Sequence, residues 1–452
     1  MAASSSAQID LFKGWPSDRL YPTSLLQTAS HTLLSESSLS IPALIYGADP
    51  GPSSLLETLS EFLSDFYSSS WTNPSRLTIT GGASQSLACI LQVFSDPSYT
   101  KNVYMVAPTY FLACRIFEDN GFAGRLRAVP EDEEGINLER LEHMLSCDEL
   151  ENGWLDRCPI KRPFPNQKLY QNILYCVPTF SNPSGKTMTL RRREQLVRLA
   201  RRYHCLIITD DVYDLLHWDP KKLGKAVLPR LVDVDHTLDG GVSSPFGNVV
   251  SNGSFSKILG PGLRTGWTES TAWFAEGLSQ CGSTRSGGSP SQFTASVIAE
   301  TLRTGALVMY LNDRLIPTYR RRSEIALEAV KEYLLPHGGV LDAMKHLSGK
   351  NQSGEMILSA VQGGYYIYVH LPDDINATSF AQQAEQEENI VVGSGENFEV
   401  WGDAESVPIK HALRICFAYE DEDLLVEGIR RLGKVLKRLS AKVTPGETLD
   451  TR

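Results

Sequence analysis

Short apolar runs alternate along the chain with longer stretches in which apolar residues recur at helical spacing. The runs at 77–80, 102–107, 173–177, 206–209 and 249–252 are rich in β-branched residues and have the length of buried strands. Helical patterns occur at 83–94, 110–120, 189–203 and 292–303. Because strands and helices alternate, the pattern predicts an α/β fold with a mostly parallel sheet and helices on both of its faces.

The pattern changes after about residue 306. A long charged helix at 310–334 precedes strands at 363–370 and 413–418 and an amphipathic helix at 420–438, which together predict a smaller α+β domain. We therefore predict an N-terminal arm (1–45) that joins the small domain, a large domain (46–305) and a C-terminal small domain (306–445). The polar stretches 147–169 and 231–248 are rich in turn formers and are predicted to be loops.

Composition narrows the range of partners. The chain has 452 residues, enough for two domains, and its formal net charge of −10 argues against nucleic acid as a partner. No apolar stretch approaches the ~18 residues that a membrane span needs, so we expect no membrane partner. The N-terminus has no secretory or transit pattern, and we expect a cytoplasmic protein. The eight cysteines form no Cys-x-x-Cys pair, so we expect free thiols and no metal site.

A distinctive polar group follows each of the five predicted strands. The carboxyl ends of parallel strands meet at one edge of a sheet, where α/β proteins bind their ligands. In chain order the groups are Gly81-Gly82-Ala83-Ser84-Gln85, then Tyr110, then Asn182, then Asp210 with Tyr213, and finally Ser254, Ser256 and Lys257 followed by Arg264. This order predicts a single ligand site built from all five strand ends.

Each of these groups suits a particular contact. A glycine turn that opens a helix presents amide groups to a phosphate. A carboxylate at a buried strand end, such as Asp210, needs a cationic partner, although Asp also caps helices. Lys257 is a potential amine nucleophile, and Arg264 with two nearby hydroxyls suits a phosphate. Taken singly, Tyr110 could also be a packing residue and Asn182 a turn former.

Together these stretches resemble the fold type I enzymes that depend on pyridoxal 5′-phosphate (PLP), and specifically the class I/II aminotransferases. The segments VPTFSNPSG (177–185) and SFSKILGPGLRTGW (254–267) carry the resemblance most specifically, and GGASQSL, APTY and DDVY support it. The resemblance covers residues 13 to about 435 and points most closely to the aromatic, 2-aminoadipate and kynurenine aminotransferase branch. It implies the PLP-dependent transferase fold and PLP as the cofactor.

The resemblance also implies a role for each residue of the set. Lys257 would hold PLP as a Schiff base and act as the general base, and Asp210 would bond the pyridine nitrogen and keep it protonated. Tyr213 and Asn182 would hold the phenolic oxygen of the cofactor, while Tyr110 would stack on its ring. The phosphate group would lie against Ala83, Ser84, Gln85, Ser254, Ser256 and Arg264.

Three further residues would face the substrate or a second subunit. Arg414 matches the arginine that binds the substrate α-carboxylate, and Gly14 matches a turn that lies over the active site. Tyr46 resembles a tyrosine that reaches the phosphate of the neighbouring subunit, which implies a homodimer with shared active sites. The segment 285–292 resembles a loop contributed to the partner's site.

The expected activity is transfer of an amino group from an aromatic or 2-aminoadipate-like L-amino acid to a 2-oxo acid such as 2-oxoglutarate. The long 147–169 segment and Gly393-Ser394-Gly395, where Pro-Gly is commoner in the family, depart from its pattern and leave the substrate open. A β-lyase, a decarboxylase or a biosynthetic PLP enzyme would use the same cofactor residues. A non-catalytic regulator would need a DNA-binding domain, and the residues before Gly14 are too few for one.

Overall fold

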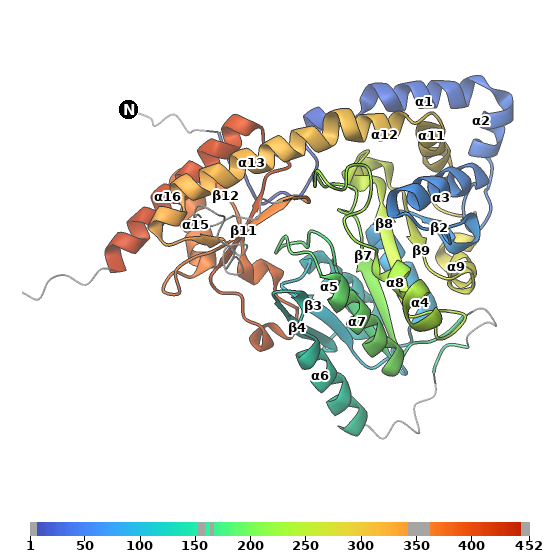
Figure 1. Ribbon diagram of the computed structural model, residues 1–452, viewed down its shortest axis with the longest axis horizontal. Helices are drawn as coiled ribbons and strands as arrows, with labels where there is room; N and C mark the ends of the chain where they lie inside the picture. The colour runs from blue at the N-terminus through green and yellow to red at the C-terminus, as the bar shows by residue number, and fades with distance from the viewer. Residues whose placement is uncertain (1–6, 152–158, 163–166, 342–361, 444–452) are drawn as a thin grey trace, which may run out of the picture.

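The computed structural model describes residues 7–151, 159–162, 167–341 and 362–443. Figure 1 shows a large sheet enclosed by helices beside a smaller sheet flanked by the long helices α13 and α16. The helices are α1 (Thr23–Ser35), α2 (Ser37–Leu44), α3 (Ser53–Tyr67), α4 (Ala83–Phe94), α5 (Phe111–Phe117), α6 (Leu138–Glu151), α7 (Leu190–Arg202), α8 (Leu231–Thr237), α9 (Ala272–Ser279), α10 (Gly282–Arg285), α11 (Gln292–Arg303), α12 (Ala306–Tyr310), α13 (Ile316–Tyr333), α15 (Ala377–Glu388) and α16 (Glu422–Val443).

The large sheet has the strand order β2-β9-β8-β7-β6-β3-β4-β5. From β8 to β4 its strands are parallel, whereas β9 runs antiparallel to both β2 and β8, and β5 runs antiparallel to β4. The strands are β2 (Leu77–Thr80), β3 (Val103–Ala107), β4 (Leu126–Asp132), β5 (Gly135–Ile136), β6 (Asn172–Cys176), β7 (Cys205–Asp210), β8 (Val249–Ser254) and β9 (Gly266–Glu269). All five predicted strands are present, and the α/β prediction is confirmed.

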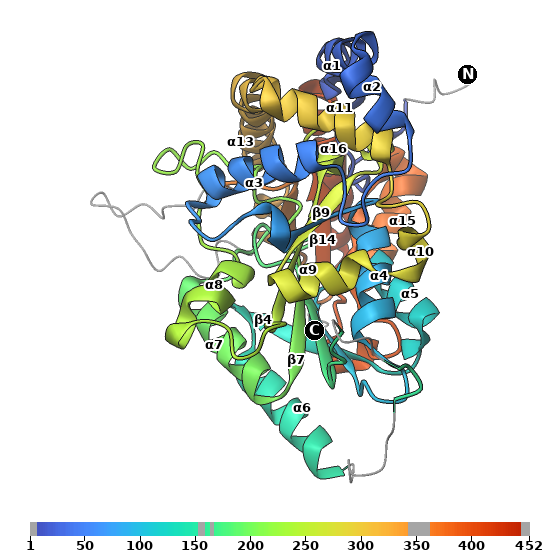
Figure 2. The ribbon, with the colours of Figure 1, turned by 90° about the vertical axis from the view of Figure 1, so that its right-hand side faces the viewer.

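Helices cover both faces of this sheet, as Figure 2 shows. Helices α4, α5 and α9 pack on one face, and α6, α7 and α8 pack on the other. Every residue of β3, β6, β7 and β8 is buried, which explains why β3, β6 and β7 are largely apolar at consecutive positions instead of alternating. Strand β8 is apolar only at Val249 and Val250 and continues with buried polar residues and a glycine. The polar residues at the strand ends therefore stand out against an otherwise apolar background.

The small sheet is antiparallel, with the order β10-β11-β14-β13. Its strands are β10 (Val340–Leu341), β11 (Tyr366–His370), β13 (Gly393–Ser394) and β14 (Ala412–Cys416), and beside it β1 (Ile9–Asp10) pairs with β12 (Ile390–Val391). The amide of Cys416 also donates to the carbonyl of Leu11, at 2.8 Å. Residues from both ends of the chain thus meet here, while the domain boundaries after residues 45 and 305 stay a prediction.

Two helices occupy stretches that were expected to be loops. The stretch 231–248 was expected to be a loop, but α8 occupies its first part because Leu231, Val232 and Val234 pack on the sheet and the Asp233 carboxylate accepts the Arg230 amide. Helix α6 likewise extends into the expected 147–169 loop as far as Glu151, and residues 152–158 and 163–166 lie outside the described residues.

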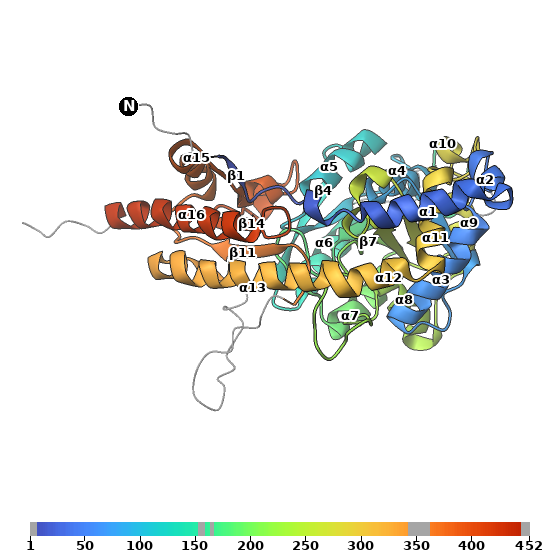
Figure 3. The ribbon, with the colours of Figure 1, turned by 90° about the horizontal axis from the view of Figure 1, so that it is seen from above.

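Two of the predicted helices are interrupted or extended by π turns. The helix predicted at 110–120 is α5 followed by a π turn at Glu118–Phe122. Helices α12 and α13 continue one another through a second π turn, and Figure 3 shows this rod running from the large sheet to the small one. Among the described helices, none combines the length and the apolarity that crossing a membrane requires.

Candidate active site

A cavity of about 440 Å³ lies at the carboxyl ends of β3, β6, β7 and β8, where residues of the small sheet and the N-terminal segment face the large sheet. Most of the predicted site residues line it. They are Gly14, Ala83, Ser84, Tyr110, Asn182, Asp210, Tyr213, Ser254, Ser256, Lys257, Arg264 and Arg414. The two that do not line it are Gln85 and Tyr46. Strand ends far apart in the sequence therefore converge as expected.

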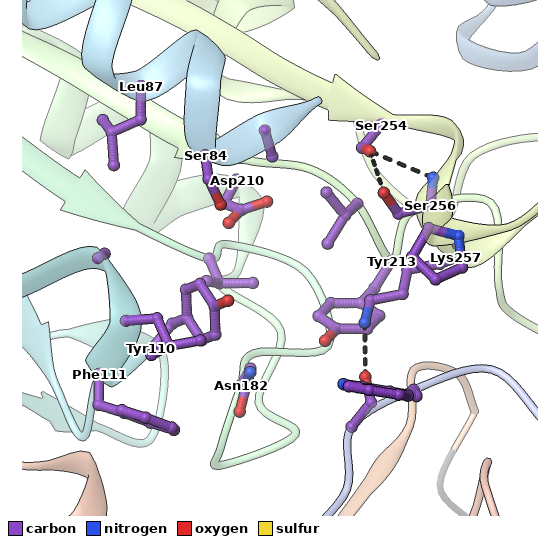
Figure 4. Close-up of a pocket in the computed structure, with 18 of the residues that line it drawn as sticks. Ser84, Leu87, Tyr110, Phe111, Asn182, Asp210, Tyr213, Ser254, Ser256 and Lys257 are labelled. Carbon is purple, nitrogen blue, oxygen red and sulfur yellow. Dashed lines mark hydrogen bonds between the residues drawn. The ribbon is translucent and has the colours of Figure 1, made fainter. Parts of the chain in front are cut away.

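Lys257 ends a short 3-10 turn that follows β8 directly. Figure 4 shows its side chain reaching into the cavity, where its amine donates a hydrogen bond of 2.6 Å to the carbonyl of Gly14. Burial lowers the pKa of the Lys257 amine to about 8, and Asp210 partly opposes that shift. The amine is consequently closer to its neutral, nucleophilic form than an exposed lysine would be.

Asp210 is the last residue of β7 and is only 8% exposed. Its Oδ2 accepts a 2.9 Å hydrogen bond from the Tyr175 hydroxyl, whereas its Oδ1 is buried and has no hydrogen-bond partner in the described part of the chain. Burial raises the pKa of the Asp210 carboxyl to about 6. The neighbouring Asp211 carboxylate accepts hydrogen bonds from the hydroxyls of Thr209 and Ser251 and does not line the cavity. Of the two adjacent acids, Asp210 is therefore the one that faces the cavity.

A glycine turn and an arginine meet at the start of α4. Gly82 has φ 94°, a conformation that favours glycine, and a Cβ there would lie 2.8 Å from Arg264 Nη2. Arg264 donates to the Gly81 carbonyl at 2.9 Å, and Ser254 donates to Ser256 at 2.8 Å. The turn, the first amides of α4, two hydroxyls and a guanidinium thus form one anion-binding corner.

Gln85 supports this corner from outside the cavity. Its Oε1 accepts the Gly81 amide at 2.9 Å and its Nε2 lies 3.0 Å from the Cys89 sulfur. Both polar atoms of the Gln85 side chain are engaged in this way, so the side chain is placed to hold the Gly81 turn and not to contact the phosphate directly. Tyr46 is 86% exposed, so its side chain points to solvent in the single chain.

Arg414 extends from β14 into the cavity and is buried. Its Nη1 donates to Asn182 Oδ1 at 2.7 Å and its Nη2 donates to the carbonyl of Phe12. The guanidinium carbon lies 4.3 Å from the ring centre of Tyr366, 4.6 Å from that of Phe398 and 5.0 Å from that of Phe12. A cation enclosed in this way is fixed in direction and suited to a planar carboxylate.

Tyr213 and Tyr110 lie on either side of the expected place of the cofactor ring. The hydroxyls of Tyr213 and Tyr366 are 2.9 Å apart, and burial raises the pKa of the Tyr213 phenol, which therefore stays protonated. Tyr110 stands at the N-cap of α5, and burial raises the pKa of its phenol too. Figure 4 shows the Tyr110 ring on the side of the cavity opposite Lys257.

Several lining residues were missed by sequence reasoning. Phe12, Phe111 and Tyr366 line the cavity, as does Tyr175. Tyr175 could have been found, because side chains two apart on a strand share a face and Tyr175 and Val177 both face the cavity. Phe111 directly follows the predicted Tyr110 at the start of α5, so its position in the chain could also have indicated it. Phe12 and Tyr366 could not have been found, because only the packing of the N-terminal segment and the small sheet brings them here.

The described residues fit PLP. A buried carboxylate oxygen without a partner at Asp210 matches a protonated ring nitrogen, and the amine of Lys257 enters the same cavity. The anion-binding corner around Gly82 and Arg264 matches the phosphate. No group of three or more His, Cys, Asp or Glu side chains able to hold a metal occurs in the described ranges.

Comparisons with known proteins agree with this geometry. A family model described as aminotransferase class I and II matches residues 38–432. An uncharacterized protein of Saccharomyces cerevisiae is 32% identical over 449 residues, which span 95% of this chain and 97% of its own. Aromatic-amino-acid aminotransferase 1 of Thermococcus litoralis is 27% identical over 434 residues, which span 96% of this chain and 89% of its own.

Solved structures show the same relationship. A kynurenine aminotransferase of Pyrococcus horikoshii, in a complex with PMP, superimposes with a TM-score of 0.75 at 26% identity, covering 96% of this chain and 92% of its own. LysN, the alpha-aminoadipate aminotransferase of Thermus thermophilus, superimposes with a TM-score of 0.73 at 25% identity, covering 96% and 94%. These findings confirm the family resemblance and the fold expected from the sequence.

Proposed function

Because the chain belongs to the class I and II aminotransferases and is a PLP-dependent enzyme, we propose that its amino donor is an aromatic L-amino acid. The proposed acceptor is a 2-oxo acid, with 2-oxoglutarate as the first candidate. Bound PLP supplies an aldehyde that captures the amino group and a ring that accepts electrons from the substrate Cα. The protein's own residues must bind the substrate, orient it and move its protons.

We assign these tasks to the residues that line the cavity. Lys257 binds the cofactor covalently and, once released, moves the proton from the substrate Cα. Asp210 accepts a hydrogen bond from the ring nitrogen and keeps it charged. Tyr213 and Asn182 hold the phenolic oxygen, and Tyr110 packs on the ring. The corner around Arg264 takes the phosphate, and Arg414 takes the α-carboxylate.

The observation that carries the choice of donor is the aromatic wall beside Arg414. Phe12 stacks on Phe111 with ring centroids 6.2 Å apart and an interplanar angle of 16°, and Phe398 meets both rings edge-on. Leu112 and Ile116 from the α5 region extend the same apolar surface along the cavity. A substrate held by its carboxylate at Arg414 would place its side chain against this wall, which favours an aromatic group. The aromatic and kynurenine aminotransferases among the similar proteins support the same choice.

One observation favours 2-aminoadipate as a second candidate donor. Lys13 lines the cavity, with its amine 3.4 Å from the Tyr419 hydroxyl and 4.8 Å from the centre of the Trp15 ring. A cation at this position could pair with the distal carboxylate of a dicarboxylic substrate. The same pairing would serve 2-oxoglutarate as the acceptor.

Steady-state kinetics separate the two donors. We expect kcat/KM for the best of phenylalanine, tyrosine and tryptophan to exceed that for L-2-aminoadipate by about tenfold or more, since burial of a large apolar side chain is worth about 1.5–3 kcal/mol. Lys13→Met should lower kcat/KM for 2-aminoadipate and for 2-oxoglutarate and leave kcat/KM for phenylalanine unchanged. A higher kcat/KM for 2-aminoadipate that Lys13→Met abolishes would instead favour the second candidate.

The type of reaction is tested by its products. A β-lyase would release ammonia and a decarboxylase would release carbon dioxide, whereas transamination transfers the amino group to the added 2-oxo acid in equal amount. We expect one glutamate for each aromatic 2-oxo acid formed. Ammonia or carbon dioxide in stoichiometric yield would contradict the proposal.

We also propose that the enzyme is a homodimer with shared active sites and that Tyr46 contacts the phosphate held by the partner. A run of exposed apolar side chains on and after α2 supports this, because single chains rarely expose so many together. These residues are Ile41 (60% exposed), Leu44 (66%), Ile45 (59%) and Tyr46 (86%).

Hybrid dimers test the sharing of sites. Tyr46→Phe should raise the Kd for PLP about tenfold, because one hydrogen bond to a charged phosphate is lost. In a hybrid of one Tyr46→Phe subunit and one Lys257→Ala subunit, one site would hold both substitutions and the other would be intact. We expect that intact site to bind PLP with wild-type affinity. A monomer in sedimentation equilibrium, or a hybrid with the weak affinity of Tyr46→Phe, would contradict the proposal.

A further inference from the structure

The two oxygens of the Asp210 carboxylate have different surroundings. One oxygen, Oδ2, accepts a 2.9 Å hydrogen bond from the Tyr175 hydroxyl. The other, Oδ1, is buried without a hydrogen-bond partner among the described residues. The carboxylate is therefore held at one oxygen and open at the other, and a buried open oxygen is costly unless a ligand satisfies it.

Tyr175 is held firmly enough to set the direction of this carboxylate. It lies on β6, next to β7 in the parallel sheet, and pairs in register with Ile208, two residues before Asp210. The Tyr175 side chain is 2% exposed, and Phe117 of α5 packs edge-on against its ring, with centroids 5.8 Å apart. A phenol fixed in this way offers its hydroxyl in one direction only.

We infer that Tyr175 is a positioning residue, which holds Oδ2 of Asp210 and so directs Oδ1 to the ring nitrogen of PLP. This inference rests on the proposed role of Asp210 at that nitrogen. Tyr175 itself touches the carboxylate and acts on the cofactor through it. Tyr175 lies inside β6 and not at its end, so the strand-end pattern that identified the other site residues did not select it.

Tyr175 has a second effect, on the charge of Asp210. Burial raises the pKa of the Asp210 carboxyl to about 6, Asp211 raises it further, and the Tyr175 hydrogen bond is the largest of the opposing influences. A donor to a carboxylate stabilises its ionised form. The other ionisable groups that interact with Asp210 are Lys257 after β8, Cys176 on β6, Tyr110 before α5, Tyr213 after β7 and Tyr366 on β11.

Removing the hydroxyl should therefore leave Asp210 protonated over a wider pH range. Hydrogen bonds to charged groups are typically worth about one to two pKa units, so we expect Tyr175→Phe to raise the pKa of Asp210 by about that amount. A protonated Asp210 could no longer keep the ring nitrogen charged. The ionised fraction of Asp210 at pH 7 should fall from about 0.9 to about 0.5 for a gain of one pKa unit and to about 0.1 for a gain of two, so the Kd for PLP should rise about twofold or about tenfold, respectively.

The apoprotein gives a test that does not depend on turnover. Because the pKa of folded Asp210 is raised above its ordinary value of 3.8, Asp210 favours the folded state at low pH, and this contribution is lost as pH rises toward about 6. In Tyr175→Phe the pKa of Asp210 is higher still, so stability continues to fall with rising pH beyond the point at which the wild-type protein stops losing it. The deficit in Tm relative to wild type should therefore be larger at pH 8 than at pH 5.

Tyr170→Phe is the matched control. Tyr170 is also fully buried, and its hydroxyl donates to the Gly247 carbonyl at 2.7 Å, away from the cavity. Its loss should lower Tm equally at both pH values and leave the Kd for PLP unchanged. A Tyr175→Phe protein that behaves like this control, with a pH-independent deficit and unchanged Kd, would overturn the inference.

A double-mutant cycle separates the inference from the assignment on which it rests. Asp210→Asn should itself raise the Kd for PLP, and Tyr175→Phe should then add little in that background. Unchanged PLP affinity in Asp210→Asn would contradict the role of Asp210, whereas an additive effect of Tyr175→Phe would contradict only the role of Tyr175. Should Tyr175→Phe fail to fold, 3-fluorotyrosine at position 175 keeps the ring and strengthens the donor. The pKa of Asp210, followed through the pH dependence of Tm, should then shift to lower pH. An unchanged pH dependence of Tm would overturn the inference.

Discussion

Lys257→Ala will produce a protein that folds but has no covalently bound cofactor. The visible absorbance of bound PLP should be lost, because the lysine at the strand ends is removed. The other lysine that lines the cavity among the described residues is Lys13, and its amine lies beside Trp15 and Tyr419. We expect kcat to fall by roughly a thousandfold or more, since a general base alone contributes roughly 10²–10⁴-fold and covalent capture is lost with it. Absorbance spectra and steady-state rates check both expectations.

Lys257→Arg is the control for charge. It keeps a cation near the carbonyl of Gly14, which accepts from the Lys257 amine at 2.6 Å, but a guanidinium is a poor nucleophile and proton carrier at neutral pH. We expect it to be as inactive as Lys257→Ala while retaining more of the apoprotein's stability. A wild-type spectrum in either variant would remove Lys257 from the mechanism.

Arg414→Gln will have the second largest effect, and it will act on the substrate and not on the cofactor. A bidentate pair with the α-carboxylate is lost, which should lower kcat/KM by roughly two to three orders of magnitude, or about 3–4 kcal/mol. PLP absorbance should remain. The loss should be similar for every amino donor, because all of them carry the α-carboxylate.

Arg322→Gln separates loss of binding from loss of stability. Arg322 is buried beside the small sheet, where it donates to the Ala418 carbonyl and to Asp421, and it does not line the cavity. Its substitution should lower Tm and leave KM for the amino donor near its wild-type value. If Arg414→Gln behaved in the same way, the α-carboxylate would have to bind elsewhere.

Most of the candidate cofactor-binding residues line one cavity, and the sequence could predict this because of how parallel sheets are built. Each predicted strand ends in a distinctive group, and parallel strands place their carboxyl ends along one edge. Lys257 and Asp210 therefore lie in one cavity whatever the detailed packing of the helices. Local turn chemistry adds Gly82, whose backbone angle favours glycine. These features depend on neighbouring residues in the chain, which a sequence displays directly.

Features that depend on distant packing could not be found in the same way. The stretch 231–248 looked like a loop because its glycines and serines outweigh the short apolar pattern of α8, which becomes a helix only because the sheet covers it. Similarly, Gln85 matches the phosphate turn by position, yet its side chain supports the Gly81 amide.

The sequence by itself determined the family, the cofactor and the chain order of the groups proposed to hold it, because these follow from the residues at the strand ends. Only the tertiary structure decided what surrounds Arg414, the residue proposed to bind the substrate α-carboxylate. Phe12, Tyr366 and Phe398 come from three distant segments to enclose Arg414, and Tyr175 meets Asp210 across two strands. The enclosure of Arg414 arises only when the small sheet and the N-terminal segment pack against the large sheet, and the contact between Tyr175 and Asp210 arises only when β6 and β7 pair within the large sheet.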